Sequence, residues 1–330
     1  MKEFLRKKNI IFSAKRYGID ALGAMAQGLF ASLLIGTIIS TLGEQLGIGI
    51  LVTVGGYAKG ATGAAMAISI GVALQCPPLV LFSLAAVGMA ANELGGAGGP
   101  LAVLVVTIFA AEFGKLVSKE TKIDIIVTPF VTICVGVLLS LGCAPAIGAA
   151  ASTVGTAIMW ATELQPFFMG IIVSVIVGIA LTLPISSAAI CAALSLTGLA
   201  GGAAVAGCCA QMVGFAVMSF KENKWGGLLA QGLGTSMLQM GNIVRNPKIW
   251  IPPTLASMVT GPLSTMVFHL ENIPAGSGMG TCGLVGPIGI YTAMQGSGNS
   301  MMWPGILLIC FVLPAVLTLF FGALCRKAGW

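Results

Sequence analysis

The sequence predicts an all-α polytopic membrane protein, and three observations support this fold class. Hydrophobic residues make up 57% of the 330-residue chain and charged residues only 8%, with a mean hydropathy of +1.02, which excludes a soluble domain of ordinary composition. Uncharged stretches such as residues 165–184 (QPFFMGIIVSVIVGIALTLP) are long enough to cross a bilayer core of about 30 Å. The alternating pattern of a membrane β-barrel is absent, so the spanning elements must be helices.

The first 18 residues mix basic and apolar side chains, which predicts an amphipathic helix lying in the membrane interface. The apolar run that follows extends from about Ala21 to Ser40. This run is too long for the apolar core of a cleaved signal peptide, so we expect a retained first span.

Further apolar runs follow before the next group of basic residues, and their positions are 21–42, 46–75 with a glycine-rich break at 55–63, 77–91, and 100–117. The glycines and proline of ANELGGAGGP (91–100) predict a tight turn between the last two runs. Residues 123–142 predict another span, whereas the Ala/Gly-rich stretch 142–161 is ambiguous.

The second half contains a clear span at 167–183, followed by an apolar stretch at 183–220 that is longer than one span. Pro184 and the TGLAGG segment break this stretch. Two interpretations remain open: a re-entrant hairpin, or small residues that allow close helix packing. Residues 225–250 are too polar and glycine-rich for a comfortable span, and runs near 251–268 and 304–324 complete the chain. The whole pattern predicts about ten transmembrane helices plus one or two re-entrant hairpins.

The net charge of +6 is concentrated in four groups of basic residues beside the predicted spans: Lys2, Arg6, Lys7, Lys8, Lys15 and Arg16; Lys115, Lys119 and Lys122; Lys221 and Lys224; Arg326 and Lys327. Under the positive-inside rule these groups face the cytoplasm, so both termini are cytoplasmic and the number of crossings is even. Because no basic domain remains outside the spans, we expect the lipid bilayer and not nucleic acid as the partner of this charge.

Catalysis and metal binding have little support. The nine cysteines show no metal or redox spacing, and we expect them to be small buried hydrophobic residues. The chain has one histidine, no HExxH motif and no recognisable Ser/His/Asp set. We therefore predict neither a catalytic site nor a metal or other cofactor. Ionisable residues at span ends, such as Glu112 beside Lys115, are expected to be solvated or ion-paired.

A candidate binding site begins at His269 and Glu271, which precede the glycine-dense run NIPAGSGMGTCGLVG (272–286). Each glycine costs about 0.8–1 kcal/mol relative to alanine in a helix interior. An unwound segment, however, presents backbone N–H and C=O groups to a polar solute within a protein-lined cavity. The candidate residues in this run are Gly276, Ser277, Gly278, Gly280 and Thr281. The alternative is an extramembrane loop in which His269 is structural.

Four segments, GSGMGTCGLVGPIG, NIVRNPKIWIPPTLASMVTGPL, LPISSAAICAALSLTGLAGGAAVAGCCAQMVGFAV and IDIIVTPFVT, resemble the membrane EIIC proteins of the sugar phosphotransferase system. The similarity is strongest to a subgroup named after the perfringolysin O regulator. The resemblance implies a homodimer in the bacterial cytoplasmic membrane, with residues 19–162 as a dimerisation scaffold and residues 163–330 as a transport half that moves as an elevator. It also implies that a separate EIIB protein supplies any phosphorylation.

In those relatives a histidine and the glutamate of a Gly-Ile-Thr-Glu motif hold the sugar. This chain lacks that tetrapeptide, so His269 and Glu271 are candidates only, together with Ser186 and Ser187 of the 186–202 region. The first functional hypothesis is therefore a transporter of a small polar solute, a sugar or a related compound. The second is a membrane sensor that regulates toxin expression, and the absence of a recognisable output domain argues mildly against it.

Overall fold

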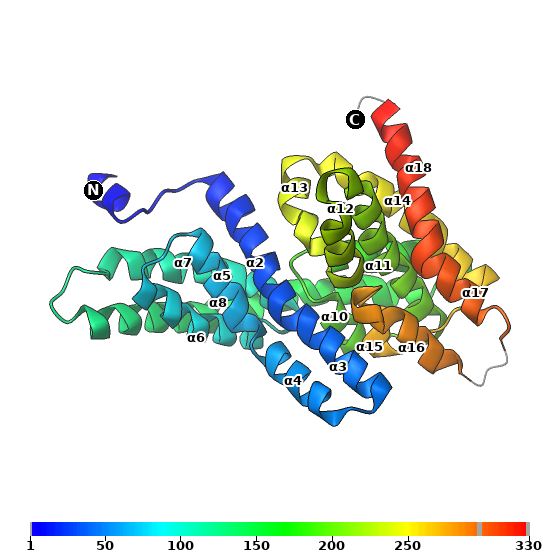
Figure 1. Cartoon of the computed structure of the whole chain (residues 1–330), viewed down its shortest axis with the longest axis horizontal. Coiled ribbons are helices and arrows are strands. Elements are labelled where there is room, and N and C mark those ends of the chain that lie inside the picture. Colours follow the sequence, from blue (N-terminus) through cyan, green and yellow to red (C-terminus); the bar gives the residue numbers. More distant parts are fainter. Residues whose placement is uncertain (1, 296–298, 328–330) are drawn as a thin grey trace. The chain divides into compact units, whose positions relative to one another are not determined.

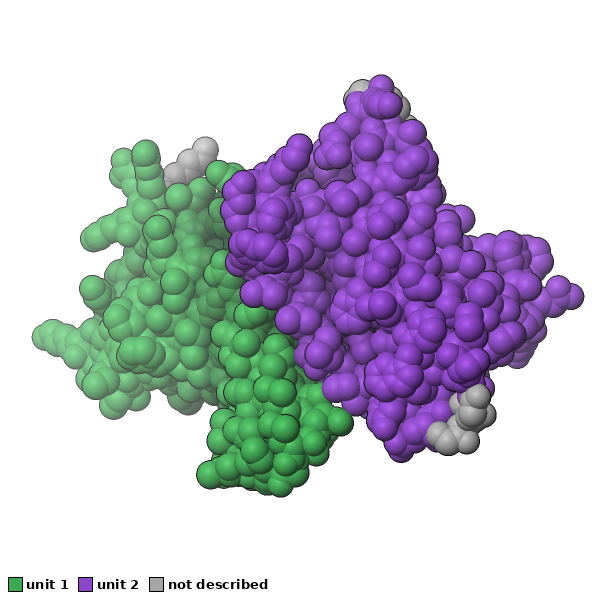
Figure 2. Space-filling view, turned by 45° about the vertical axis from the view of Figure 1, so that its right-hand side comes forward, with its two compact units in different colours: residues 1–150 green, residues 151–330 purple. Residues whose placement is uncertain are grey.

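The computed structural model describes residues 2–295 and 299–327, and the described residues form helices joined by short turns (Figure 1). The chain divides into two compact units, unit 1 at residues 1–150 and unit 2 at residues 151–330 (Figure 2). Five helical stretches of the described chain are long and apolar enough to cross a membrane: Arg16–Leu46, Pro78–Val117, Asp124–Thr162, Gly198–Met218 and Met302–Lys327. These stretches confirm an all-helical, membrane-type fold.

Unit 1 begins with a short helix, α1 (Lys2–Lys7), before the first long helical stretch. That stretch runs through α2 (Ala21–Leu29) and α3 (Ile35–Leu46), and it agrees with the span predicted at 21–42. Gly47 ends α3 in a left-handed conformation with φ of +68°, which a glycine adopts without steric cost. The chain then folds back, and α4 (Gly49–Gly60) packs against α3.

The apolar run predicted at 46–75 forms two helices, α4 and α5 (Thr62–Ala73), with the break at Ala61. A helix of this length extends for only about 18 Å, so neither piece spans a bilayer core alone. Next, α6 (Pro78–Gly95) and α7 (Gly99–Val117) pack together as a hairpin. Gly96, with φ of +49°, lies in the turn between them, where the ANELGGAGGP segment predicts one.

The ambiguous stretch 142–161 belongs to a single helix, α8, which runs without interruption over Asp124–Thr162. The boundary between the two units falls within this helix. Pro129 and Pro145 lie inside α8. Its length of 39 residues corresponds to about 58 Å, well beyond a bilayer core of about 30 Å.

Unit 2 is organised around α11 (Gly198–Met218), which packs against α9 (Pro166–Thr182), α14 (Ile251–Pro262) and α18 (Leu313–Lys327). Alanine, glycine and cysteine occupy most of the buried positions of α11. A helix that is apolar on all sides is suited to a central position, and its small side chains let the neighbouring backbones approach closely.

The predicted break in the 183–220 stretch lies between α10 (Ser187–Ala193) and α11. Segment 225–250 forms only short helical pieces, the longest of them α12 (Phe220–Leu229) and α13 (Met240–Arg245), in agreement with its polar composition. The expectation of buried cysteines holds for Cys191, Cys208, Cys209, Cys282 and Cys310. It is wrong for Cys143, which is exposed on α8, and Cys76, Cys134 and Cys325 are only partly buried.

Candidate solute-binding site

Two helical breaks of unit 2 meet at the predicted binding residues. The first break follows α9, where Leu183 to Ser186 lead into α10. The hydroxyl of Ser186 accepts a 3.2 Å hydrogen bond from the N–H of Ala189 and thereby caps α10. Ser186 therefore has a defined structural role at the tip of this break.

The second break contains the glycine run. It follows η7 (Leu263–Val267) and includes the single helical turn α15 (Pro274–Ser277), the short turn η8 (Cys282–Leu284) and α16 (Val285–Met294). Gly280 and Gly283 have φ of +56° and +52°, a backbone conformation that residues other than glycine rarely adopt. The run is unwound, as the density of glycine predicts.

The two breaks are joined by direct hydrogen bonds between residues far apart in sequence. Ser187 Oγ donates to the carbonyl of Gly278 at 2.7 Å, and Ser277 Oγ donates to the carbonyl of Leu196 at 2.8 Å. Ser187 and Ser277 are 4% and 0% exposed. We call this arrangement, formed by residues 186–198 and 272–281, the hairpin contact.

Glycine is required within the hairpin contact because backbone or buried side-chain atoms lie too close to leave room for a Cβ atom. A Cβ atom at Gly278 would lie 2.5 Å from the Ser187 carbonyl oxygen, and one at Gly276 would lie 2.5 Å from Oδ1 of Asn272. Asn272 itself is 1% exposed and donates from Nδ2 to the Gly286 carbonyl at 3.3 Å. The polar groups of the predicted site are therefore paired with one another in this conformation.

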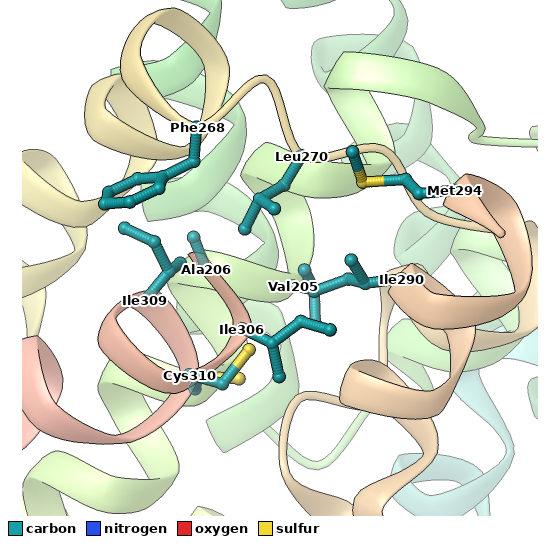
Figure 3. Packing of buried hydrophobic residues seen from close by; sticks show 10 residues of the cluster. Val205, Ala206, Phe268, Leu270, Ile290, Met294, Ile306, Ile309 and Cys310 are labelled. Atoms are coloured by element: carbon teal, nitrogen blue, oxygen red, sulfur yellow. The ribbon is translucent and has the colours of Figure 1, made fainter. Parts of the chain in front are cut away.

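His269 and Glu271 lie apart from these buried groups, because side chains alternate along the segment that leads into the glycine run. Phe268 and Leu270 point into an apolar cluster with α11, α16, α17 (Met302–Leu307) and η9 (Leu308–Val312) (Figure 3). His269 and Glu271, by contrast, are exposed. His269 also has a φ of +46°. The structure thus brings the serines and glycines together and leaves these two ionisable residues on the surface.

A second feature of unit 2, a pocket of about 320 Å³, was not predicted from the sequence. Amide, hydroxyl and carboxylate side chains line one part of it, and apolar side chains line the rest. We call it the amide pocket, and its lining residues are Phe215, Met218, Ser219, Glu222, Asn223, Gln239, Asn242 and Ile249. A small number of precisely placed polar groups within an otherwise apolar wall is typical of small-molecule binding sites.

A chain of hydrogen-bonded side chains fixes the polar wall of the amide pocket. Asn242 donates to Oε1 of Gln239 at 2.9 Å, Gln239 donates to Oε1 of Gln231 at 2.8 Å, and Gln231 donates to Ser219 Oγ at 2.9 Å. Gln231 and Gln239 are 3% and 6% exposed. Asn242 is exposed and lines the pocket, and no described hydrogen bond uses its side-chain oxygen, which leaves this acceptor available.

One turn deeper in α11, fully buried Gln211 anchors the neighbouring helices. Its Oε1 accepts from Trp250 Nε1 at 3.1 Å, and its Nε2 donates to Thr254 Oγ1 at 3.2 Å. Gln211 precedes the pocket residue Phe215 by four positions, so both lie on the same face of the helix. This bonding fixes the face of α11 that carries the pocket.

The short π-helical segment η4 (Ala230–Gly234) connects the amide pocket with the glycine run. Its Gln231 side chain belongs to the hydrogen-bonded wall of the pocket, and the carbonyl of the next residue, Gly232, accepts the hydroxyl of Thr281. Thr281 is fully buried. Hydrogen bonds on neighbouring residues of η4 therefore join the glycine run and the wall of the amide pocket.

The profile of the family described as "Phosphotransferase system, EIIC" matches residues 19–330. The chain belongs to this EIIC family. No curated protein and no solved structure matches the sequence. EIIC proteins are membrane transport subunits, and the membership supports a permease role for this chain in the phosphotransferase system.

The sequence of this EIIC chain gives only a weak signal for the amides of the pocket wall, which were not predicted from the sequence as site residues. Gln231, Gln239 and Asn242 all fall in the segment 225–250, whose polarity argued against a span. They are 8 and 3 residues apart, a spacing that would place them on one face of a continuous helix, but the segment folds into short irregular pieces. No group of three or more possible metal ligands lies together anywhere in the described part of the chain.

Proposed function

We propose that this EIIC protein is a permease that carries a small polar solute, a sugar or a related compound, across the bacterial cytoplasmic membrane. The observation that carries the proposal is the link through η4 between an unwound glycine run and a pocket lined by amides. Hydroxyl-rich solutes require both donors and acceptors, and amide side chains supply both. Family membership favours this transport role over a sensor of gene expression.

We assign the binding surface to the hairpin contact and its surroundings: Gly276, Ser277, Gly278, Gly280 and Thr281 with Ser186 and Ser187, and with His269 and Glu271 on the exposed segment nearby. When the two breaks separate, Ser187 loses the Gly278 carbonyl and Ser277 loses the Leu196 carbonyl. Ser277 keeps the Ile273 carbonyl of its own segment. Hydroxyl groups of the solute then replace the lost partners. The free energy gained by binding the solute therefore offsets the free energy lost when the contact opens.

In this proposal the second half of the chain carries the solute by an elevator movement against the first half, and two copies form a homodimer. Both termini face the cytoplasm. A separate EIIB protein supplies any phosphoryl group, since the proposal gives this chain a transport role and no catalytic one.

Uptake of a panel of radiolabelled sugars into proteoliposomes tests the proposal, with Ser277→Ala and His269→Ala compared against the matched variant Ser13→Ala in unit 1. We expect uptake of at least one sugar by the native chain and a reduction of about tenfold in Ser277→Ala, the value of one buried hydrogen bond. Gly280→Leu is expected to abolish uptake. Unchanged uptake in all three unit 2 variants would refute the site, and no uptake of any sugar would refute the function.

A further inference from the structure

A polar pocket of about 450 Å³ lies in unit 1, far along the sequence from the residues assigned to the solute. The N-terminal segment, the turn after α5, the end of α7 and the turn that follows α7 form its walls. Lys7, Lys8, Lys115 and Lys119 line it, and among its described lining residues Glu120 is the one acidic side chain. We call it the lysine pocket.

The inner lysines hold the pocket together. Lys115, which is 1% exposed, lies 2.8 Å from a carboxylate oxygen of Glu112 and donates to the carbonyls of Asn9 and Leu74 at 3.2 Å each. Lys8 pairs with Glu120 and donates to the carbonyl of Ser118. These bonds fix the N-terminal segment against α5 and α7, so the pocket has rigid walls.

The outer lysines carry the charge that a ligand meets. Lys7 and Lys119 are both exposed, and neither forms an ion pair within the described chain. Neither charge is neutralised by an ion pair as those of Lys8 and Lys115 are. The Asp124 carboxylate, which accepts a 2.7 Å hydrogen bond from the backbone N–H of Lys119, offsets the charge of Lys119 in part. A pocket of this kind attracts an anion, because neighbouring like charges in a concave site reinforce one another's potential.

Large apolar side chains are exposed on the two segments that carry these lysines or follow them in the sequence. Phe4 and Phe12 of the N-terminal segment are 41% and 77% exposed, and Ile123, just before α8, and Ile125, in its first turn, are 58% and 73% exposed. Exposure of such side chains to water is unfavourable, whereas contact with lipid hydrocarbon stabilises them. Basic residues next to exposed aromatic and aliphatic residues are typical of segments in the membrane interface.

We propose that the lysine pocket binds the phosphate of an anionic phospholipid, whose acyl chains lie against the flanking apolar residues. A free phosphate ion shares the charge chemistry but makes no use of the apolar flanks, so the lipid is the occupant that both observations favour. The bound lipid holds the N-terminal segment against the rest of unit 1. It is a different molecule from the transported solute.

Native mass spectrometry of the full chain in detergent tests this proposal, with phosphatidylglycerol and phosphatidylcholine of identical acyl chains as probes. We expect phosphatidylglycerol to bind more tightly, and this preference to shrink as salt increases. Each lysine near an anionic lipid contributes roughly fivefold to affinity, so Lys7→Gln/Lys119→Gln should weaken phosphatidylglycerol binding by about 25-fold. The matched variant Lys221→Gln/Lys224→Gln removes the same charge from unit 2 and should lose less than threefold.

Equal binding of the two lipids by the native chain would overturn the proposal, as would equal losses in the two double variants. Complete displacement of phosphatidylglycerol by millimolar inorganic phosphate would also overturn it, since the pocket would then recognise phosphate alone. The comparison of the two lipids on the native chain decides the matter even if a variant fails to fold.

Discussion

The ammonium group of Lys115 lies 2.8 Å from Oε2 of Glu112 inside unit 1, where the two side chains are 1% and 10% exposed. The other carboxylate oxygen of Glu112 accepts a 3.0 Å hydrogen bond from the hydroxyl of Tyr17. One buried ion pair on α7 therefore connects this helix to the start of the first span. The sequence predicts a solvated or ion-paired Glu112, and the structure confirms the ion pair.

Removal of the positive charge alone should reduce the stability of the protein more than removal of both charges. Lys115→Met leaves the Glu112 carboxylate buried without a counter-charge, and we expect a loss of about 3–5 kcal/mol in the free energy of unfolding. Lys115→Met/Glu112→Gln keeps an acceptor for Tyr17 and removes the lone charge, so it should recover about 2 kcal/mol of that loss.

Chemical denaturation in detergent measures these differences, with Lys221→Met as the control at an exposed lysine. The control should change stability by less than about 0.5 kcal/mol. If the single and double variants are equally unstable, the ion pair contributes nothing and the lost contacts to Asn9 and Leu74 explain the whole effect.

A second prediction concerns the close packing of α11 in unit 2. A Cβ atom at Gly202 would lie 1.8 Å from the carbonyl oxygen of Leu270, which is backbone and has little freedom to move. Gly202→Ala should therefore destabilise the protein by more than about 3 kcal/mol. Gly142→Ala on α8 is the matched control, because nothing lies within 4 Å of the added atom.

Gly142→Ala should be neutral or should stabilise the chain by up to about 1 kcal/mol, since alanine is the better helix former. Thermal unfolding of the two variants in the same detergent makes the comparison. Equal melting temperatures would show that the contact between α11 and the Leu270 segment relaxes without cost.

These glycines illustrate what the sequence predicts and where it stops. Long apolar runs predicted the helices at 21–42 and 304–324, because hydropathy and length alone define such spans. Composition did not distinguish α8 as one continuous helix, since alanine and glycine at 142–161 have a weak hydropathy signal. It also gave no way to tell a glycine that packs tightly, such as Gly202, from one in open space, such as Gly142.

The candidate site was predicted only in part for a similar reason. The cost of glycine in a helix predicted that residues 276–283 unwind, which is a local property. The partners of Ser187 and Ser277 lie 91 and 81 residues away, and a single sequence carries no record of such pairing. The exposure of His269 follows from the burial of Phe268 and Leu270, a tertiary effect.

A third prediction follows from the thiol of Cys76, which lies in the turn between α5 and α6 of unit 1. Burial raises the pKa of this thiol to about 11, and the positive charge of nearby Lys115 opposes the shift. The thiolate is the reactive form, so raising the pKa lowers reactivity at neutral pH. The rate of alkylation at Cys76 should increase about tenfold per pH unit up to roughly pH 10 without a plateau.

Peptide mapping by mass spectrometry after pulses of iodoacetamide measures the rate at Cys76 in the full chain. The same measurement in denaturing detergent is the control, and there the rate should level off near pH 9. A plateau near pH 9 in the folded protein would contradict the burial of this thiol.

The final prediction tests whether the amide pocket takes part in transport. Asn242 is exposed at the outer end of the hydrogen-bonded chain that runs through Gln239 to Gln231. Asn242→Ala removes the amide that lines the pocket and also removes the donor to the buried Oε1 of Gln239, so it should raise the KM for uptake about five- to tenfold and cost about 1–3 kcal/mol of stability. Gln239→Leu leaves the buried Oε1 of Gln231 without its donor, so it should also cost about 1–3 kcal/mol of stability.

Gln165→Ala is the matched control, because this exposed amide precedes α9 and lies outside the pocket lining. Uptake kinetics in proteoliposomes and denaturation of the same preparations separate affinity from stability. A KM that is unaltered in Asn242→Ala, beside a reduced stability in Gln239→Leu, would restrict the amide network to a structural role. A raised KM in Asn242→Ala would instead show that the amide pocket contributes to solute binding beside the hairpin contact, to which η4 connects it through the hydrogen bond between Gly232 and Thr281.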